Sequence, residues 1–373
     1  MSGIYIHIPF CKQACHYCDF HFSTSLKHKD ALIDSIVGEI DQRAENWKSE
    51  KFETIYFGGG TPSIVPVADI EKILTKLRQN FQIDNRAEVT LEANPDDLSG
   101  EKLQAYRHIG INRLSIGVQS FFDEDLQKLN RSHQARQAVE AIQQAQTAGI
   151  DNITIDLIYG IPGLTDKKWE QNIQTALDLQ IPHISAYALT VEPQTALAWL
   201  IKKEKYPPVS EEQSACQFEI LQRKLQENNF IHYEISNFGK EDYFSRHNMS
   251  YWKNIPYLGL GPAAHSYNGK QRRWNIANNA KYIKGMDAKN YFETEDLSPQ
   301  DIYNELIMTG LRTIWGVDLQ KIRLLGEDFI EYLDKNAQKY IGKSLFIEEN
   351  HLKARPESLF LIEGVISDLF WVD

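Results

Sequence analysis

The sequence predicts an α/β protein built on a partial (β/α)6 barrel, followed by a smaller α-rich C-terminal domain. Short runs rich in β-branched and aromatic residues alternate with longer segments of helical periodicity. Unusual glycine, cysteine and acidic motifs follow these runs at regular intervals. Alternating strands and helices pair in parallel through right-handed crossovers, which a doubly wound sheet would also satisfy. The 373 residues are enough for two or three domains.

Composition excludes several classes of protein. The chain has 40 Lys and Arg against 51 Asp and Glu, a formal charge of −11, which argues against a nucleic-acid partner. It has no apolar run long enough to span a membrane. A strand-like run starts at Ile4, which leaves no room for a signal peptide. We therefore expect a cytoplasmic protein.

Six strands are predicted in the first half of the chain, at residues 4–8, 54–57, 88–92, 113–118, 153–158 and 183–189. Helices are predicted between them, around residues 32–40, 70–77, 101–109 and 139–149. Ser99 is a typical N-cap for the third of these helices, and Gly110 is typical of the residue that ends it.

The pattern changes near residue 205, where a charged run precedes Pro207 and Pro208. Ser210 then begins a predicted helix that ends near Asn228, and residues 231–270 indicate irregular loops and short strands. Helical periodicity returns at Ser298. The predicted division is a barrel at 1–205, a connecting region at 206–297 and a small C-terminal domain at 298–373.

The chemically distinctive segments follow the predicted strands. They occupy residues 9–18, 58–62, 92–95, 119–120 and 156–160. Barrels and open α/β sheets build their sites at the carboxyl ends of strands. These segments therefore predict a single site at that end of the sheet.

Three of the four cysteines lie together, at Cys11, Cys15 and Cys18, whereas Cys216 lies apart. This grouping indicates metal or redox chemistry rather than disulfides. Three thiolates within eight residues suit a [4Fe–4S] cluster with one iron left open to a ligand. A zinc site completed by His16 or His21 is an alternative, and three inert buried thiols are another.

The triple glycine at residues 58–60 lets the backbone approach a ligand closely, although a tight turn without a ligand would explain it equally well. Glu92, Gln119, Arg131 and Asp156 are weak signals individually. Their shared position at strand ends is what points to a site.

The cysteine spacing and the segment Gly-Gly-Gly-Thr-Pro at 58–62 resemble the radical S-adenosylmethionine superfamily. Further motifs are similar to the oxygen-independent coproporphyrinogen III oxidase group, namely those at residues 5–11, 117–121, 129–131 and 155–160. The resemblance implies a radical S-adenosylmethionine barrel, an electron donor to the cluster, and reductive cleavage of the sulfonium to a 5′-deoxyadenosyl radical.

The resemblance also implies roles for individual residues, none of them assigned as catalytic. Cys11, Cys15 and Cys18 would hold the cluster, and S-adenosylmethionine would bind its open iron. Gly59, Gly60 and Thr61 would meet the methionyl end of that cofactor. The remaining pocket residues would be Tyr5, Tyr17, Glu92, Gln119, Arg131 and Asp156.

Two features resemble the heme-chaperone branch, the HemW-type proteins, rather than the decarboxylase. Phe20 stands where the decarboxylase pattern has a fourth cysteine, and ten residues precede Cys11 where the decarboxylase has a longer segment. The branch also bears an H-N-x-x-Y-W motif, which matches residues 247–252.

The resemblance implies binding of heme and its transfer to an acceptor protein, which could be membrane-associated. His247 would be the iron ligand, with His265 a second candidate, since imidazole is a common axial ligand of heme. By itself, a histidine beside Tyr-Trp more often belongs to a packed loop. Two other functions stay open: oxidative decarboxylation of coproporphyrinogen III, and radical chemistry on another substrate.

Overall fold

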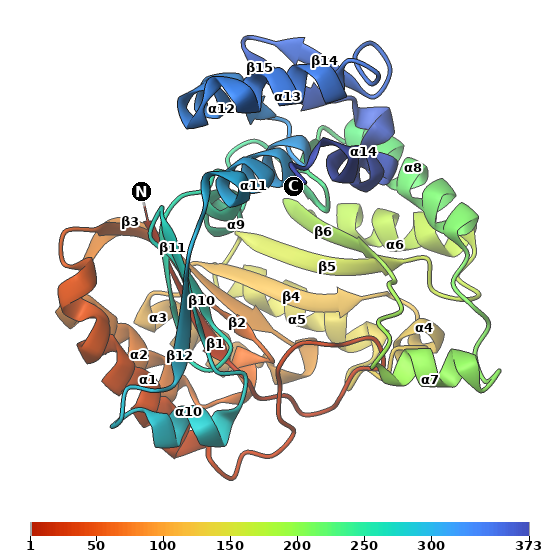
Figure 1. Ribbon diagram of the computed structural model, residues 1–373. Coiled ribbons are helices and arrows are strands. Elements are labelled where there is room, and N and C mark those ends of the chain that lie inside the picture. The colour runs from red at the N-terminus through yellow and green to blue at the C-terminus, as the bar shows by residue number, and fades with distance from the viewer. Residues whose placement is uncertain (1, 373) are drawn as a thin grey trace.

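The computed structural model describes residues 2–372, and a large curved sheet with helices on its outer side dominates it (Figure 1). Its central strands run parallel and pair in sequence order. They are β1 (Ser2–Ile8), β2 (Lys51–Gly59), β3 (Gln82–Ala93), β4 (Arg113–Gln119), β5 (Ile153–Tyr159) and β6 (His183–Ala188). The predicted α/β fold and its parallel strands are confirmed.

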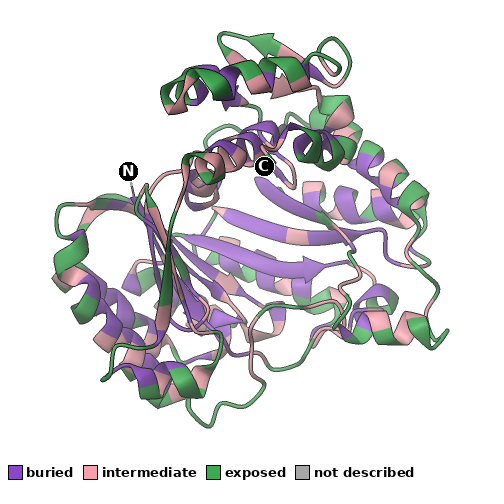
Figure 2. Cartoon of the chain, viewed as in Figure 1, coloured by how far each residue is buried: buried purple, intermediate pink, exposed green. Residues whose placement is uncertain are grey.

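Helices connect these strands and bury their apolar faces against the sheet (Figure 2). They are α1 (Lys29–Ala44), α2 (Val67–Asn80), α3 (Gly100–Ile109), α4 (Asp123–Lys128), α5 (Ala135–Thr147) and α6 (Asp166–Asp178), with short 3-10 turns η1 (Glu45–Trp47), η2 (Pro62–Ile64) and η3 (Pro95–Asp97). The predicted cap of α3 is confirmed, because Ser99 Oγ accepts from Lys102 N over 3.3 Å and Gly110 ends the helix at φ 100°.

Strands from later in the chain extend the sheet at both edges. Within residues 2–372 the order is β12-β11-β10-β9-β1-β2-β3-β4-β5-β6-β8-β7. The added strands are β7 (Ile231–Glu234), β8 (Asn237–Gly239), β9 (Tyr257–Leu260), β10 (His265–Tyr267), β11 (Gln271–Asn275) and β12 (Phe292–Asp296). β9 pairs in parallel with β1, and β8 pairs antiparallel with β6. Strands from both sides of residue 205 thus share one sheet, and the three-part division stays a prediction.

Four helices accompany these added strands: α7 (Ala196–Lys202), α8 (Glu211–Glu227), α9 (Arg246–Trp252) and α10 (Asn279–Gly285). The α8 helix begins at the predicted cap, where Ser210 Oγ accepts from Gln213 N over 3.2 Å. Among the residues described, none of the helices is long and apolar enough to cross a bilayer.

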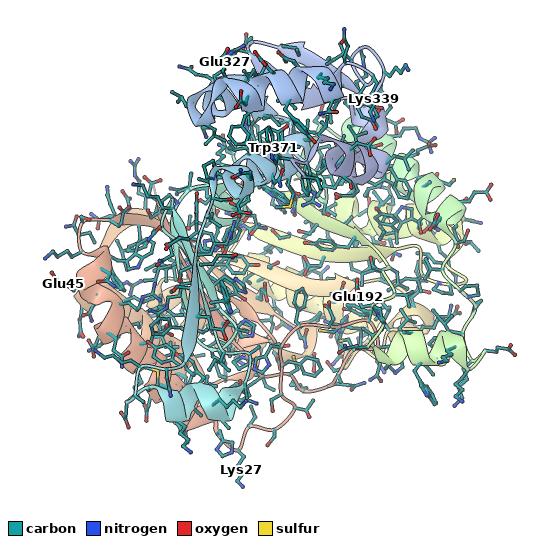
Figure 3. The ribbon with its side chains drawn as sticks, viewed as in Figure 1. Lys27, Glu45, Glu192, Glu327, Lys339 and Trp371 are labelled. Atoms are coloured by element: carbon teal, nitrogen blue, oxygen red, sulfur yellow. The ribbon has the colours of Figure 1, made fainter. Side chains whose placement is uncertain are left out.

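The C-terminal part has a hydrophobic core of its own, which includes Tyr303, Ile307 and Leu333. Trp371, labelled in Figure 3, packs its ring near Tyr303 and Phe329 of this core. The elements are α11 (Pro299–Leu311), β13 (Val317–Asp318), α12 (Leu319–Leu325), α13 (Glu327–Ala337), β14 (Leu345–Glu348), β15 (His351–Ala354), η4 (Pro356–Leu361) and α14 (Ile362–Leu369). The predicted α-rich C-terminal domain is confirmed, with a small three-stranded sheet added to it.

A buried carboxylate joins α1 to the strands that extend the sheet beyond β1. Glu39 is fully buried and accepts from Gly261 N over 2.9 Å and from Tyr282 Oη over 2.6 Å. The guanidinium groups of Arg43 and Arg273 lie 3.6 and 3.7 Å from its carboxylate. This one carboxylate therefore holds together three segments that are far apart in the sequence: α1, the residue after β9, and residues 273–282.

We expect Glu39→Ala to lower the free energy of unfolding by about 3–5 kcal/mol, because it leaves Arg43 buried without its counter-charge. Urea denaturation measures this loss. Glu45→Ala is the matched control at the first residue of η1, directly after the same helix, where the side chain points into solvent (Figure 3). Its effect should stay within about 0.5 kcal/mol, and equal losses in the two variants would contradict the assignment.

Candidate functional site

One cavity of about 440 Å³ opens at the carboxyl ends of the parallel strands. Its volume lies in the range of small-molecule sites, about 300–1,000 Å³. The structure brings most of the predicted site residues to its wall: Cys11, Cys15, Tyr17, Cys18, Gly59, Gly60, Thr61, Glu92, Gln119, Arg131 and Asp156. Tyr5 and His247 are not among the residues that line it.

The three cysteines lie on the loop between β1 and α1, and this loop is tied to the segment after α4. Gln13 Nε2 donates to Asn130 Oδ1 over 2.6 Å, and His16 N donates to Leu129 O over 3.1 Å. Arg131 follows directly in that segment. The anchoring therefore fixes the cysteines and the arginine relative to one another.

The thiols face the polar groups that end β2 and follow α4. Thr61 Oγ1 donates to Cys11 Sγ over 3.6 Å, and Arg131 donates to Cys15 Sγ over 3.3 Å. Burial raises the pKa of the Cys11 thiol to about 11, so metal binding there must displace a proton. Within the described part of the chain, no three His, Cys, Asp or Glu side chains are grouped closely enough to hold a single metal ion.

The glycines at the end of β2 are required by close packing against the first strand and its loop. Gly59 has a φ of 114°, and a Cβ there would lie 2.6 Å from the His7 ring. A Cβ on Gly60 would lie 2.7 Å from the carbonyl oxygen of Phe10. Packing alone thus demands glycine here, while the same residues leave bare backbone on the cavity wall.

Two carboxyl groups face the cavity from β3 and β5. Glu92 accepts from Tyr56 Oη over 2.8 Å and from Gly59 N over 3.1 Å, yet burial raises its pKa to about 7. Burial also raises the pKa of Asp156 to about 6, although the Arg131 guanidinium opposes the shift. A ligand with positive charge would therefore favour ionisation of both groups.

Arg131 is held rigidly beside these carboxyls. Its guanidinium donates to Asn94 Oδ1 over 2.7 Å and to Gly117 O over 2.8 Å. Its Nε is buried and has no hydrogen-bond partner in the structure. Gln119 ends β4 with a φ of 68°, an uncommon conformation outside glycine that turns this residue onto the cavity wall.

His247 occupies the opposite end of the barrel from the cysteines, inside the ring of strands. Its Nδ1 lies 2.8 Å from Thr54 Oγ1, and its Nε2 lies 2.8 Å from Tyr251 Oη. The side chain is buried, and burial lowers its pKa to about 3. Heme ligation by His247 therefore stays a prediction, and it requires the ring to give up one of these hydrogen bonds.

Tyr5 also faces the barrel interior, beneath the cavity rather than on its wall. Its hydroxyl lies 3.1 Å from His7 Nδ1, and its ring stacks 6.1 Å from the ring of Tyr56. The ring also lies close to Gly58, where an added Cβ would come within 3.0 Å of it. His265, the second candidate heme ligand, is exposed on β10.

Several cavity residues were not singled out from the sequence. Tyr187, the penultimate residue of β6, lies on the cavity wall, and Thr190 and Glu192 follow it in the segment that crosses in front of the sheet (Figure 3). Their sequence signal is the same strand-end position that identified the other sites. Asn94, which holds Arg131, has that signal as well.

Comparison with known proteins agrees with this geometry. Residues 5–176 match the Radical SAM superfamily, and residues 297–361 match the HemN C-terminal domain. The Bacillus subtilis protein named heme chaperone HemW is 36% identical over 325 residues, which cover 86% of each chain. The Lactococcus lactis protein of the same name is 34% identical over 344 residues, which cover 90% of each chain. The chain belongs to the HemW family.

A solved structure extends the likeness of this HemW-family chain to the fold as a whole. Coproporphyrinogen III oxidase (HemN) from Escherichia coli superimposes with a TM-score of 0.85 at 22% identity, covering 99% of this chain and 89% of that one. At this identity the likeness establishes the radical S-adenosylmethionine fold. The predicted family resemblance and barrel are both confirmed.

We expect Gly60→Ala to displace the cysteine loop, because the added methyl group would meet the Phe10 backbone. The free energy of unfolding should fall by about 1–3 kcal/mol, and iron bound after anaerobic reconstitution should fall with it. Gly100→Ala is the control, since nothing lies within 4 Å of a Cβ there. Full iron content and unchanged stability in Gly60→Ala would contradict this account of the loop.

Proposed function

We propose that this HemW-family chain is a heme chaperone that carries a [4Fe–4S] cluster and S-adenosylmethionine and delivers heme to an acceptor protein. One observation carries the cofactor part: three thiols, bare glycine backbone, a fixed guanidinium and two carboxyls share one cavity. An electron donor to the cluster and a cytoplasmic location belong to the same proposal.

The residues present fit these groups chemically. Cys11, Cys15 and Cys18 supply thiolates, the ligands that hold iron–sulfur clusters. The guanidinium of Arg131, which lines the cavity, suits a carboxylate. Glu92 and Asp156 suit an ammonium group and ribose hydroxyls. When bound, the reduced cluster and S-adenosylmethionine would supply one-electron chemistry, while the chain orients and shields them.

The heme part rests on the relatives named heme chaperones and on one local feature. Phe20 stands where the decarboxylase pattern has a cysteine, and its side chain is 71% exposed while it lines the cavity. An aromatic ring at that position offers an apolar surface in place of a fourth thiol. We retain His247 as the proposed iron ligand; because it is buried with both ring nitrogens bonded, ligation would require α9 to move away from the strands as well as the loss of one hydrogen bond.

The cluster is tested by replacing each cysteine. Cys11→Ala, Cys15→Ala or Cys18→Ala should abolish the broad thiolate-to-iron absorption after anaerobic reconstitution, because each removes one cluster ligand. Cys216→Ala should keep it, since that thiol is exposed on α8 far along the chain. Stoichiometric zinc in place of iron in metal analysis would overturn the cluster.

Binding of S-adenosylmethionine should strengthen as the pH rises through about 6 to 7, where Asp156 and Glu92 ionise. The sign follows because the cofactor carries positive charges and the ionised carboxylates attract them, so binding releases protons below these pKa values. Calorimetry across this range measures the trend. S-adenosylhomocysteine, whose thioether is neutral, should show a weaker dependence, and equal profiles would contradict the assignment.

Two assays on the same protein distinguish heme delivery from the alternative function, oxidative decarboxylation of coproporphyrinogen III. We expect stoichiometric heme binding with a Soret band and no oxidation of coproporphyrinogen III under anaerobic conditions with a reductant. His247→Ala should weaken or shift the Soret band, and the cluster-cysteine variants should retain some heme binding. Decarboxylated product would favour the oxidase, and an unchanged titration in His247→Ala would remove His247 as the ligand.

A further inference from the structure

Behind the main cavity lies a smaller one of about 60 Å³, which we call the inner chamber. Tyr56, Arg113 and Asn248 line it, together with Glu92, Asp156 and Tyr187, which also line the main cavity. These side chains are polar, and the volume is large enough to hold water. The chamber therefore connects the H-N-x-x-Y-W motif to the two cavity carboxyls.

The motif reaches the chamber because α9 closes the amino-terminal end of the barrel. Glu88 of β3 accepts from Arg246 N over 3.2 Å and from His247 N over 3.1 Å, which satisfies two donors at the start of the helix. On β1, a Cβ at Gly3 would lie 3.0 Å from His247 Nδ1, so the strand leaves just enough room for the ring. These contacts fix the motif to the strands on either side of β2.

A line of direct contacts runs from the motif to the cavity. The His247 ring stacks on the Tyr56 ring, with centroids 5.0 Å apart and an interplanar angle of 22°. Tyr56 Oη donates to Glu92 Oε1 over 2.8 Å, and Glu92 Oε2 accepts from Gly59 N over 3.1 Å. His247 is itself fixed through Thr54, so the Tyr56 ring rests on a rigid support.

We propose that α9 positions the S-adenosylmethionine site: His247 supports Tyr56 against Glu92, and Asn248 closes the inner chamber behind Glu92 and Asp156. His247 and Tyr56 are then positioning residues, which act on the cofactor through Glu92. This inference rests on the proposed function, because it requires the main cavity to bind S-adenosylmethionine.

The physical basis is the stabilisation of a buried carboxylate. The hydroxyl of Tyr56 favours the ionised form of Glu92, whereas burial and the Asp156 charge disfavour it. Tyr5, Tyr187 and Tyr251 also interact with Glu92, and burial raises the pKa of each well above its ordinary value, so they stay neutral. Arg113 lines the same chamber as a cation, and the Tyr56 substitution leaves it in place. Loss of the Tyr56 hydrogen bond therefore raises the pH at which Glu92 ionises.

The test measures the dissociation constant of S-adenosylmethionine against pH, using the full chain with its cluster reconstituted anaerobically. Tyr56→Phe keeps the ring stack and removes only the hydroxyl. We expect it to raise the dissociation constant about tenfold at neutral pH, as the loss of a hydrogen bond to a charged group does, and to move the pH midpoint upward. His247→Gln should move both quantities in the same direction.

Ser250→Ala is the control on the same helix, because its Oγ donates to the carbonyl oxygen of Arg246 within α9. It should leave the affinity and the midpoint unchanged. Iron content and a heme titration are recorded for each variant, and Tyr56→Phe should keep the heme affinity of the parent. If His247→Gln does not fold, Tyr56→Phe decides the matter alone.

The outcomes separate this inference from the proposed function. An unchanged affinity and midpoint in Tyr56→Phe overturns the inference while S-adenosylmethionine binding by the parent stands. Loss of heme binding in His247→Gln with an unchanged S-adenosylmethionine profile also overturns it, and assigns the motif to heme alone. Failure of the parent protein to bind S-adenosylmethionine overturns the proposed cofactor together with the inference.

Discussion

The alternation of side chains along β2 connects the two ends of the barrel. Thr54, Tyr56 and Gly58 share the interior face, because every second residue of a strand points the same way. Thr54 bonds His247, Tyr56 bonds Glu92, and the bare Gly58 leaves room for the Glu92 carboxyl, which a Cβ would approach to 2.9 Å. A shift of one residue in the β2 register would turn all three away from these partners.

Charge in the barrel interior is arranged around few cations. Arg131 lies beside the cysteines, and Arg113 lies at the inner chamber, where its charge lowers the pKa of His247 and that of Asp156. Both carboxyls of the cavity nevertheless have raised pKa values, because burial outweighs the attraction of the two arginines at Asp156 and the hydrogen bonds from Tyr56 and Gly59 at Glu92. A cationic ligand would therefore stabilise the ionised forms of Glu92 and Asp156.

The H-N-x-x-Y-W motif has a structural role whatever its part in heme binding. His247 is buried with both ring nitrogens bonded, and its helix is fixed to β3 through Glu88. A histidine in this setting favours the neutral form, which can stack on Tyr56 without bringing a charge near Glu92. His247 does not line the main cavity itself. It acts on the cavity through its packing against Tyr56, which in turn bonds Glu92.

The sequence by itself determined the elements that depend on local signals. The six parallel strands, the cap at Ser99, the end at Gly110 and the cap at Ser210 follow from neighbouring residues. Parallel pairing then sends the strand ends to one edge, which is why Cys11, Thr61, Glu92 and Asp156 could be predicted to meet. Only the tertiary structure decided the pairing of β9 with β1, the burial of His247 and the position of Tyr5 below the cavity. Those depend on contacts between residues far apart in the sequence, such as Gly3 with Tyr257. No local pattern encodes such contacts, because they are chosen by the packing of the whole sheet.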